Sequence, residues 1–458
     1  MHLRTGTFGF VAASLMAMEA AGSIDQSRFP APRPTSRLEQ RAPDPSPATV
    51  QAPTPDRTSP SQAALLAEAP ARSLIPAARP AGLAQPRNAS LAQWLRGFRN
   101  RALAQGIQVR VFDRAFAGIE LDQDILNRES NQPEFSRPIW AYLDSAVSES
   151  RIRNGQAMLR QHRRVLDEIE ARYGVEREIV VAVWGMESAY GSLRGRTRII
   201  PALTTLAISS RRADFYEDQL IGALRILQAG DVDERHLVGS WAGAMGHTQF
   251  IPTSYLSYAV DFRGDGHRDI WSDDPTDSLA STAAYLQRHG WTRGQPWGVE
   301  VQIPSGLNPR LANTRRSVCE WTALGVRAQR GASLPRTGEA TLMFPAGSRG
   351  PAFLAFQNFR VIKRYNNADA YAIAIGHLAD RFRGGGDFVG AWPRDDRPLS
   401  RSEREELQRH LQRSGHYAGT IDGRVGSGTL EAVRDWQSAN GLPPDGYVSM
   451  ALLSRMRR

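Results

Sequence analysis

The chain has 458 residues, 41% of them hydrophobic, so it can bury a sizeable core in more than one domain. Its formal net charge of +10 is carried by arginine, since Lys363 is the only lysine. The excess of arginine suits binding to an anionic partner, and the alternative explanation is a GC-rich genome. The sequence has no zinc-finger spacing, aromatic RNA-binding motif or basic zipper, which argues against nucleic acid, and its single cysteine, Cys319, excludes an intrachain disulfide framework.

Residues 1–22 have the order of a bacterial export signal, and residues 23–89 have the composition of a disordered linker. His2 and Arg4 precede an apolar stretch that ends in small residues, although Glu19 departs from the pattern and leaves a mildly apolar, disordered start as the alternative. The linker holds 13 of the 28 prolines and too few apolar residues to fold. We therefore expect an exported chain that has no lipid-acceptor cysteine at its start and no transmembrane segment, because no later run approaches ~20 apolar residues.

Residues 90–383 are predicted to form a mainly helical domain. One helix is expected over 151–173, where apolar residues recur at helical spacing and Gly174 provides a stop. The next helix begins at about residue 176 and is apolar on every side over 179–184, which is typical of a central buried helix.

Four short segments between about 295 and 362 depart from the helical pattern and favour β structure: VEVQIP, CEWTALGV, ATLMFPA and AFLAFQNF. They predict a small antiparallel β lobe set into the helical domain, after which NADAYAIAIGHLADRF returns to helix. A linker at 384–398 then leads to a C-terminal module at 399–458. Its leucine spacing and two Asp-Gly turns predict three short amphipathic helices.

Glu187 is the residue with the most informative chemistry. It ends an apolar run in the segment VVAVWGMESAYGS, where burial disfavours the charged form and should raise the carboxyl pKa toward neutrality. A carboxyl group that is protonated at neutral pH can act as a general acid, which glycosidic bond cleavage requires. The alternative is a structural glutamate paired with an arginine in the core.

Several separated motifs closely resemble the lytic murein transglycosylase B family. They are WGMESAYG at 184–191, SWAGAMGHTQFIPTSYLSYAVDFRGDGHRDIW at 240–271 and FQNFRVIKRYNNADAYAIAI at 356–375. The resemblance extends over about residues 90–383 and implies a lysozyme-like helical catalytic domain with an added lobe, which cleaves peptidoglycan glycan strands in the periplasm. The segment from about residue 400 to 458 is similar to three-helix peptidoglycan-binding domains and implies attachment to the cell wall.

The resemblance also explains why Glu187 has no second acid beside it in the sequence. In that family the C6 hydroxyl of the muramyl residue is the nucleophile, and an attached nucleophile needs no activation of water. Glu187 would protonate the oxygen between N-acetylmuramic acid and N-acetylglucosamine and then accept the C6 hydroxyl proton, leaving a 1,6-anhydromuramyl end. A muramidase that uses water, and a non-catalytic peptidoglycan-binding scaffold, are the alternatives.

Further site residues follow from the resemblance. Arg211 and Arg212 match arginines that contact the glycan or its peptide, with a pair of surface arginines as the alternative. The other matched positions are polar groups and aromatic platforms in the cleft, and core packing is the alternative for each aromatic ring: Tyr142, Ser240, Gln249, Tyr285, Tyr365 and Asn366. The implied partners are glycan strands and other cell-wall enzymes, and no cofactor is implied for catalysis.

The segment DFRGDGHRDIW is similar to the calcium loop of that family. Its acidic residues and glycine occupy positions 1, 5, 6 and 9 of an EF-hand-like loop, but Arg263 replaces the oxygen ligand at position 3 and Ser272 replaces the usual glutamate at position 12. Without metal the segment is an Asp-Gly turn. The expected structural calcium shell would consist of Asp261, Asp265, His267, Asp269 and Asp277.

Overall fold

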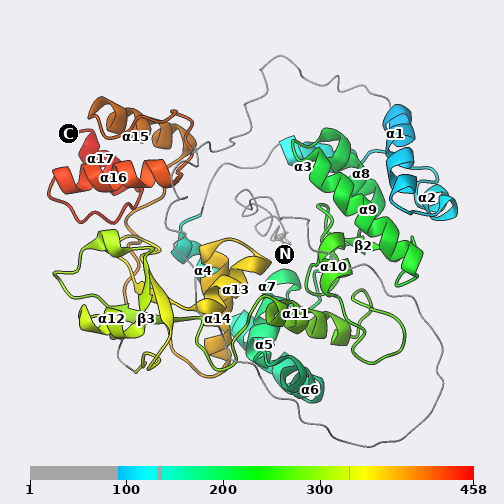
Figure 1. Ribbon diagram of the computed structural model, residues 1–458, viewed down its shortest axis with the longest axis horizontal. Helices are drawn as coiled ribbons and strands as arrows, with labels where there is room; N and C mark the ends of the chain where they lie inside the picture. Colours follow the sequence, from blue (N-terminus) through cyan, green and yellow to red (C-terminus); the bar gives the residue numbers. More distant parts are fainter. Residues whose placement is uncertain (1–90, 131–136, 330) are drawn as a thin grey trace, which may run out of the picture. The chain divides into compact units, whose positions relative to one another are not determined.

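The computed structural model describes residues 91–130, 137–329 and 331–458, so the predicted export signal and linker lie outside the described residues. The described chain is mainly helical with small antiparallel sheets, as the sequence predicts (Figure 1). Its first helices are α1 Leu91–Ala104, α2 Val109–Ala115, α3 Gln123–Ser130, α4 Ile139–Ala146, α5 Glu149–Gln161, α6 Arg163–Tyr173, α7 Arg177–Ser188, α8 Ile199–Ser209, α9 Ala213–Ala229, α10 Pro252–Tyr258 and α11 Thr276–Arg288. The short strands β1 Thr197–Arg198 and β2 Val238–Gly239 pair antiparallel.

Helix α7 is the central helix of the domain. Residues 179–185 are all buried, as its apolar character on every side predicts. It packs against α5, α6, α11 and α14 (Asp369–Phe382), so helices from distant parts of the chain surround it. The end of α7 is thereby placed inside the domain.

The helix predicted over 151–173 is two helices, α5 and α6, separated at His162. The backbone of His162 leaves the helical conformation, with φ −103° and ψ 21°. The break allows both helices to pack against α7, and the rings of His162 and Trp184 lie nearly perpendicular to each other, with centroids 5.5 Å apart. Tertiary packing therefore overrides the continuous helical periodicity of this segment.

The predicted β lobe is a five-stranded antiparallel sheet in the order β4-β6-β7-β3-β5. The prediction is wrong for CEWTALGV, which forms α12 (Val318–Ala323) because Ser317 and Glu320 make a capping box at its start. Trp321 is buried and donates its Nε1–H to the carbonyl of Ala340 at 3.0 Å. The strands are β3 Gly298–Gln302, β4 Arg315–Ser317, β5 Arg327–Ala328, β6 Glu339–Met343 and β7 Ala352–Ala355, with the 3-10 turn η2 Pro309–Leu311 between β3 and β4 and α13 Gln357–Tyr365 after β7.

The C-terminal module consists of the three predicted helices, α15 Arg401–Arg413, α16 Ser427–Ala439 and α17 Met450–Met456, coloured orange to red in Figure 1. Two buried glutamines hold its Asp-Gly turns. Gln408 accepts the N–H of Gly423 at 2.8 Å, and Gln437 accepts the N–H of Gly446 at 2.9 Å. Both glycines have positive φ, of 69° and 75°, which explains why each turn contains glycine.

Within the part of the chain that the structure describes, no helix combines the length and the apolar character that a bilayer span requires.

Candidate active site

Glu187 lies in the last turn of α7, beside an unusual backbone conformation. Three successive residues that follow it have left-handed φ values, 49° for Ala189, 59° for Tyr190 and 83° for Gly191. For a residue with a side chain this conformation costs about 1–3 kcal/mol and persists where surrounding contacts impose it. Gly185 contributes by leaving room, because a Cβ there would lie 2.6 Å from the ring of Tyr190.

His247 imposes this conformation from the neighbouring loop. The Trp184 Nε1–H donates to His247 Nδ1 at 3.1 Å, Ser188 Oγ donates to the His247 carbonyl at 2.5 Å, and the Gly191 N–H donates to Ser188 Oγ at 2.9 Å. Because Nδ1 accepts, His247 Nε2 carries the proton and donates it to the carbonyl of Ser272 at 2.8 Å. Burial lowers the pKa of His247, so its imidazole stays neutral and the turn after Glu187 stays fixed.

Tyr371 on α14 contacts the carboxyl group of Glu187. Its hydroxyl donates to Glu187 Oε1 at 2.7 Å. Burial raises the pKa of Glu187 to about 7, and the hydrogen bond from Tyr371 offsets part of that rise because it stabilises the charged form. Near neutral pH the carboxyl group can therefore both give and take a proton. Tyr371 is absent from the predicted site residues, because helical periodicity marks it as a core residue.

The carboxyl group of Glu187 has no charged partner. In the described part of the chain, burial and the Tyr371 bond account for its pKa shift, with no contribution from a neighbouring acid or base. The core glutamate paired with an arginine is therefore not what the structure contains.

Two of the predicted tyrosines lie near Glu187. Tyr142 on α4 and Tyr365 at the end of α13 have phenol pKa values raised first by burial and then by the negative charge of Glu187. The hydroxyl of Tyr365 donates to the carbonyl of Thr248 at 2.5 Å, and the next residue, Asn366, is buried. These two rings come from α4 and α13, on different sides of the chain from α7.

Ser240 and Gln249 lie in the loop that also holds His247. Ser240 is buried, and its Oγ accepts the N–H of Ala244 at 3.0 Å. Gln249 has φ 56°, and its Nε2 donates to the carbonyls of Arg194 at 3.1 Å and Gly246 at 2.9 Å. Both side chains thus stabilise the loop that supports the end of α7.

Tyr285 differs from the other predicted platforms. It is 8% exposed and lies in an aromatic cluster, with ring centroids 4.2 Å from His289, 4.7 Å from Tyr258 and 5.1 Å from Tyr365. Its hydroxyl donates to the carbonyl of Arg364 at 2.5 Å. In this structure Tyr285 is packed in the core, which is the alternative to a role as a sugar platform.

Arg211 and Arg212 lie directly before α9. The guanidinium of Arg212 is 4.1 Å from the centroid of the Phe215 ring, and Arg211 is exposed. Within the described residues, no contact joins either arginine to Glu187. Both remain predictions as substrate contacts.

Residues 90–380 match the family model described as "Transglycosylase SLT domain", which covers more than half of the chain. The chain belongs to this family. Residues 400–456 match a second model, "Putative peptidoglycan binding domain". Both matched segments lie inside the ranges that the sequence predicts for the catalytic domain and the C-terminal module.

Known relatives of this transglycosylase-family chain include solved structures. A crystal structure of SltB3 from Pseudomonas aeruginosa in complex with NAG-anhNAM-pentapeptide has a TM-score of 0.78 and 52% identity, covering 81% of this chain and 100% of that one. The membrane-bound lytic murein transglycosylase B of Escherichia coli (strain K12) is 35% identical over 242 residues, which are 52% of this chain and 65% of that protein. The Escherichia coli lytic transglycosylase Slt35 in complex with calcium has a TM-score of 0.55 and 30% identity, over 65% of this chain and 93% of that one.

The predicted calcium loop is not assembled as a metal shell in this SLT-family chain. Both oxygens of Asp277 accept backbone N–H groups, from Phe262 at 3.0 Å and from Asp269 at 2.9 Å, and Asp261 accepts three N–H groups of the loop. The carboxylate of Asp265 accepts the N–H of His267, and that of Asp269 accepts two further N–H groups. No group of three or more metal-binding side chains occurs in the described ranges. Backbone N–H groups of the chain therefore hold these carboxylates in the turns of the loop.

Calcium is therefore expected to leave the stability of the protein unchanged. A site present in the folded state alone stabilises by about 2.7 kcal/mol when the ion is at a hundredfold excess over its Kd, which shifts the melting temperature by several degrees. We expect the melting temperature in millimolar calcium and in EDTA to agree within about 1 °C, with Slt35 as the positive control. A rise of several degrees with calcium would contradict the hydrogen-bonded arrangement.

Proposed function

We propose that this protein is a lytic transglycosylase that cleaves the bond between N-acetylmuramic acid and N-acetylglucosamine in peptidoglycan and forms 1,6-anhydromuramyl ends. The observation that carries the proposal is the carboxyl group of Glu187, whose pKa is about 7 and to which no second acid contributes among the residues that the structure describes. Two relatives support the same activity: one is named as a lytic murein transglycosylase, and the other, SltB3, is solved in complex with NAG-anhNAM-pentapeptide.

The chemistry then follows from one carboxyl group used twice. Protonated Glu187 donates its proton to the glycosidic oxygen, the bond from that oxygen to C1 of the muramyl residue breaks, and the N-acetylglucosamine side leaves as an alcohol. The C6 hydroxyl oxygen of the same muramyl residue bonds to C1, and its proton passes to the Glu187 carboxylate. No water is consumed, and Glu187 returns to its protonated form.

The surroundings of Glu187 fit both steps. Tyr371 holds one carboxyl oxygen in place and stabilises the charged state that exists between the two proton transfers. The charge of Glu187 raises the pKa values of Tyr142 and Tyr365, which supports their nearness to the carboxyl group, and we infer that both rings and Asn366 contact the sugars. We infer that Arg211 and Arg212 contact the peptide or the glycan farther along the strand, and that Ser240 and Gln249 act through the loop they support.

We further infer that the protein works in the periplasm and that its C-terminal module binds the cell wall. The match of residues 400–456 to a putative peptidoglycan-binding domain supports the wall contact. The export signal predicted in residues 1–22 supports the compartment. Other cell-wall enzymes are proposed as partners on the resemblance alone.

Mass spectrometry of digested cell-wall sacculi tests the proposed reaction. Because the C6 hydroxyl rather than water attacks C1, the muropeptides released by the purified protein should each be lighter by one water than those released by a muramidase. A muramidase digest of the same sacculi is the control. Products that all carry a reducing muramic acid end would replace the proposal with the hydrolase alternative.

A further inference from the structure

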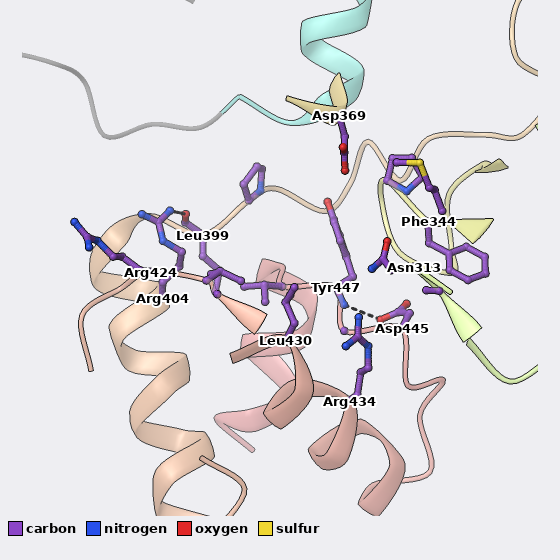
Figure 2. Close-up of a pocket in the computed structure, with 18 of the residues that line it drawn as sticks. Asn313, Phe344, Asp369, Leu399, Arg404, Arg424, Leu430, Arg434, Asp445 and Tyr447 are labelled. Atoms are coloured by element: carbon purple, nitrogen blue, oxygen red, sulfur yellow. Dashed lines mark hydrogen bonds between the residues drawn. The ribbon is translucent and has the colours of Figure 1, made fainter. Parts of the chain in front are cut away.

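Helix α4, which carries Tyr142, must be held in place against α7, which carries Glu187. It packs against α14, and Figure 2 shows α4, in cyan, above Asp369, the first residue of α14. The cavity of about 780 Å³ drawn in the same figure lies between the β lobe and the C-terminal module, and no described residue of α4 is among those that line it. The contact that joins α4 to the surroundings of Glu187 comes from α5 instead.

The C-terminal end of α4 is held by Arg151, which lies in the first turn of α5. Its Nη1 donates to the carbonyl of Ser145 at 3.1 Å and to that of Ala146 at 2.9 Å, and these are the last two residues of α4. The last carbonyls of a helix have no partner within the helix, and a nearby arginine side chain can satisfy them. The guanidinium therefore fixes the end of α4 within about one turn of Tyr142.

The same arginine contacts the chain on both sides of Glu187. Its Nη1 lies 3.6 Å from Sδ of Met186, the residue directly before Glu187. Its backbone carbonyl accepts the hydroxyl of Tyr190 at 2.7 Å, and Tyr190 has a left-handed φ of 59° in the turn that follows Glu187. Arg151 thus joins the end of α4 to the backbone before and after the carboxyl group.

Helix α5 is shaped to receive the ring of Tyr190. At Gly155, about one turn beyond Arg151, a Cβ would lie 2.7 Å from the hydroxyl oxygen of Tyr190, and at Gly185 on α7 a Cβ would meet the same ring. Glycine is less favourable than alanine inside a helix, so space for this ring is the reason for both glycines. The ring fixes α5 against the end of α7.

The charge of Arg151 is not balanced by an acid. The side chain is half-buried, and within the part of the chain that the structure describes no carboxylate forms an ion pair with it. Burial lowers the pKa of this guanidinium, because the charged form loses contact with water. A partly buried charge without an ion pair is an expensive means of joining two helices, and such groups concentrate at functional sites.

Tyr142 lies within electrostatic reach of both Arg151 and Glu187. Its pKa is raised first by burial and then by the charge of Glu187, and the charge of Arg151 opposes that rise. Glu187 itself shows no such influence of Arg151, since burial and the Tyr371 bond account for its pKa. The contacts of Arg151 therefore bear on the place of the Tyr142 ring rather than on the acidity of Glu187.

We propose that Arg151 is a positioning residue that fixes the ring of Tyr142 relative to the carboxyl group of Glu187. Its guanidinium joins the end of α4 to Met186, and its backbone carbonyl holds Tyr190, so the two walls of the site keep one spacing. A sugar held against Tyr142 then presents its glycosidic oxygen to the acid in the alignment that proton transfer requires. The inference rests on the proposed function, because it takes Tyr142 as a sugar contact of the strand cleaved at Glu187.

The variant Arg151→Met tests this role in the full chain. Methionine keeps an unbranched apolar side chain but has no donor for the carbonyls of α4. We expect kcat/KM for soluble glycan strands, expressed per folded protein and followed by release of anhydromuramyl products, to fall about tenfold, since a misplacement of about 1 Å can cost ~100-fold. Arg153→Met, which changes an exposed arginine of the same helix, is the matched control and should keep the kcat/KM of the unmodified protein.

Two further measurements separate positioning from support of the fold and from an effect of charge. In a Tyr142→Ala background, Arg151→Met should cost less than about twofold, because the ring that Arg151 positions is absent. The falling limb of the kcat/KM profile of Arg151→Met should stay near pH 7, since Arg151 does not contribute to the pKa of Glu187. Should Arg151→Met unfold at the assay temperature, Arg151→Lys takes its place in the same comparison, because lysine keeps the charge but is too short to reach both carbonyls.

The outcomes distinguish this inference from the proposed function. An unchanged kcat/KM per folded protein, an equal loss in both backgrounds, or a falling limb moved to higher pH would overturn the positioning role and leave the proposed reaction intact. Absence of anhydromuramyl products from the unmodified protein would overturn both.

Discussion

Replacing Glu187 by glutamine is expected to lower the turnover of peptidoglycan strands strongly. General acid–base groups contribute ~10²–10⁴-fold, and we expect a loss at the upper end of this range. Glutamine keeps the shape of the side chain and an oxygen that accepts from Tyr371, but it has no proton to donate and cannot take one back. The loss is large because the same group serves both proton transfers. Turnover of soluble strands, followed by release of anhydromuramyl products, measures it.

The same variant should be more stable than the unmodified protein at neutral pH, although its turnover falls. The pKa of Glu187 is about 7 in the folded protein, above its ordinary value of 4.5, so the folded state holds this proton more tightly than the unfolded state. The unmodified protein therefore loses stability as pH rises from about 4.5 to about 7, whereas glutamine does not titrate. We expect Glu187→Gln to match the unmodified protein near pH 4 and to exceed it above pH 7, by up to about 3 kcal/mol.

Glu168→Gln on α6 provides the control, since it makes the same chemical change on a side chain that is 40% exposed. It should leave turnover unaltered. A core glutamate with a purely structural role predicts the reverse pattern for Glu187→Gln, namely lower stability at every pH and a loss of activity that follows the loss of folded protein. A stable and fully active variant would remove Glu187 from the mechanism.

The burial and the pKa of Glu187 could be predicted because both depend on local sequence. A run that is apolar on every side identifies a central helix, and a single carboxyl group at its end must be desolvated. The three helices of the C-terminal module and the β lobe follow in the same way from local spacing and turn residues. These features need no knowledge of which distant segments meet.

The remaining site features depend on tertiary contacts between distant segments. Tyr371 lies 184 residues from Glu187 along the chain, so its hydrogen bond has no local signal. Tyr285 has the residue type of a sugar platform, but α11 turns it into a cluster with Tyr258 and His289. The aspartates of the predicted calcium loop have the required spacing, yet the backbone N–H groups of the folded loop occupy their oxygens. The spacing of residues in the sequence therefore predicts which residue types a site contains, whereas the tertiary contacts determine whether those side chains face a ligand or the protein itself.

Replacing Tyr371 by phenylalanine is expected to lower kcat by ~10–100-fold and to shift the pH profile. The hydroxyl of Tyr371 donates to Glu187 Oε1 at 2.7 Å, and a hydrogen bond to a charged group is worth about 1.5–3 kcal/mol. Without it, the carboxylate formed after the first proton transfer is less stable and less well oriented. Burial keeps the pKa of Tyr371 well above its usual range, so the hydroxyl remains a donor at every pH of the assay.

The direction of the pH shift distinguishes this role from general support of the fold. The reaction begins from protonated Glu187, so kcat/KM should fall as pH rises through about 7, the pKa of that carboxyl group in the free protein. The bond from Tyr371 lowers this pKa, and its removal should move the falling limb to higher pH. Tyr365→Phe removes a hydroxyl that donates to Thr248 rather than to Glu187. The falling limb of the kcat/KM profile of this variant should therefore stay near pH 7, even if its turnover changes. A limb that stays at the same pH in Tyr371→Phe, or that shifts equally in both variants, would mean that the hydrogen bond does not set the acidity of Glu187.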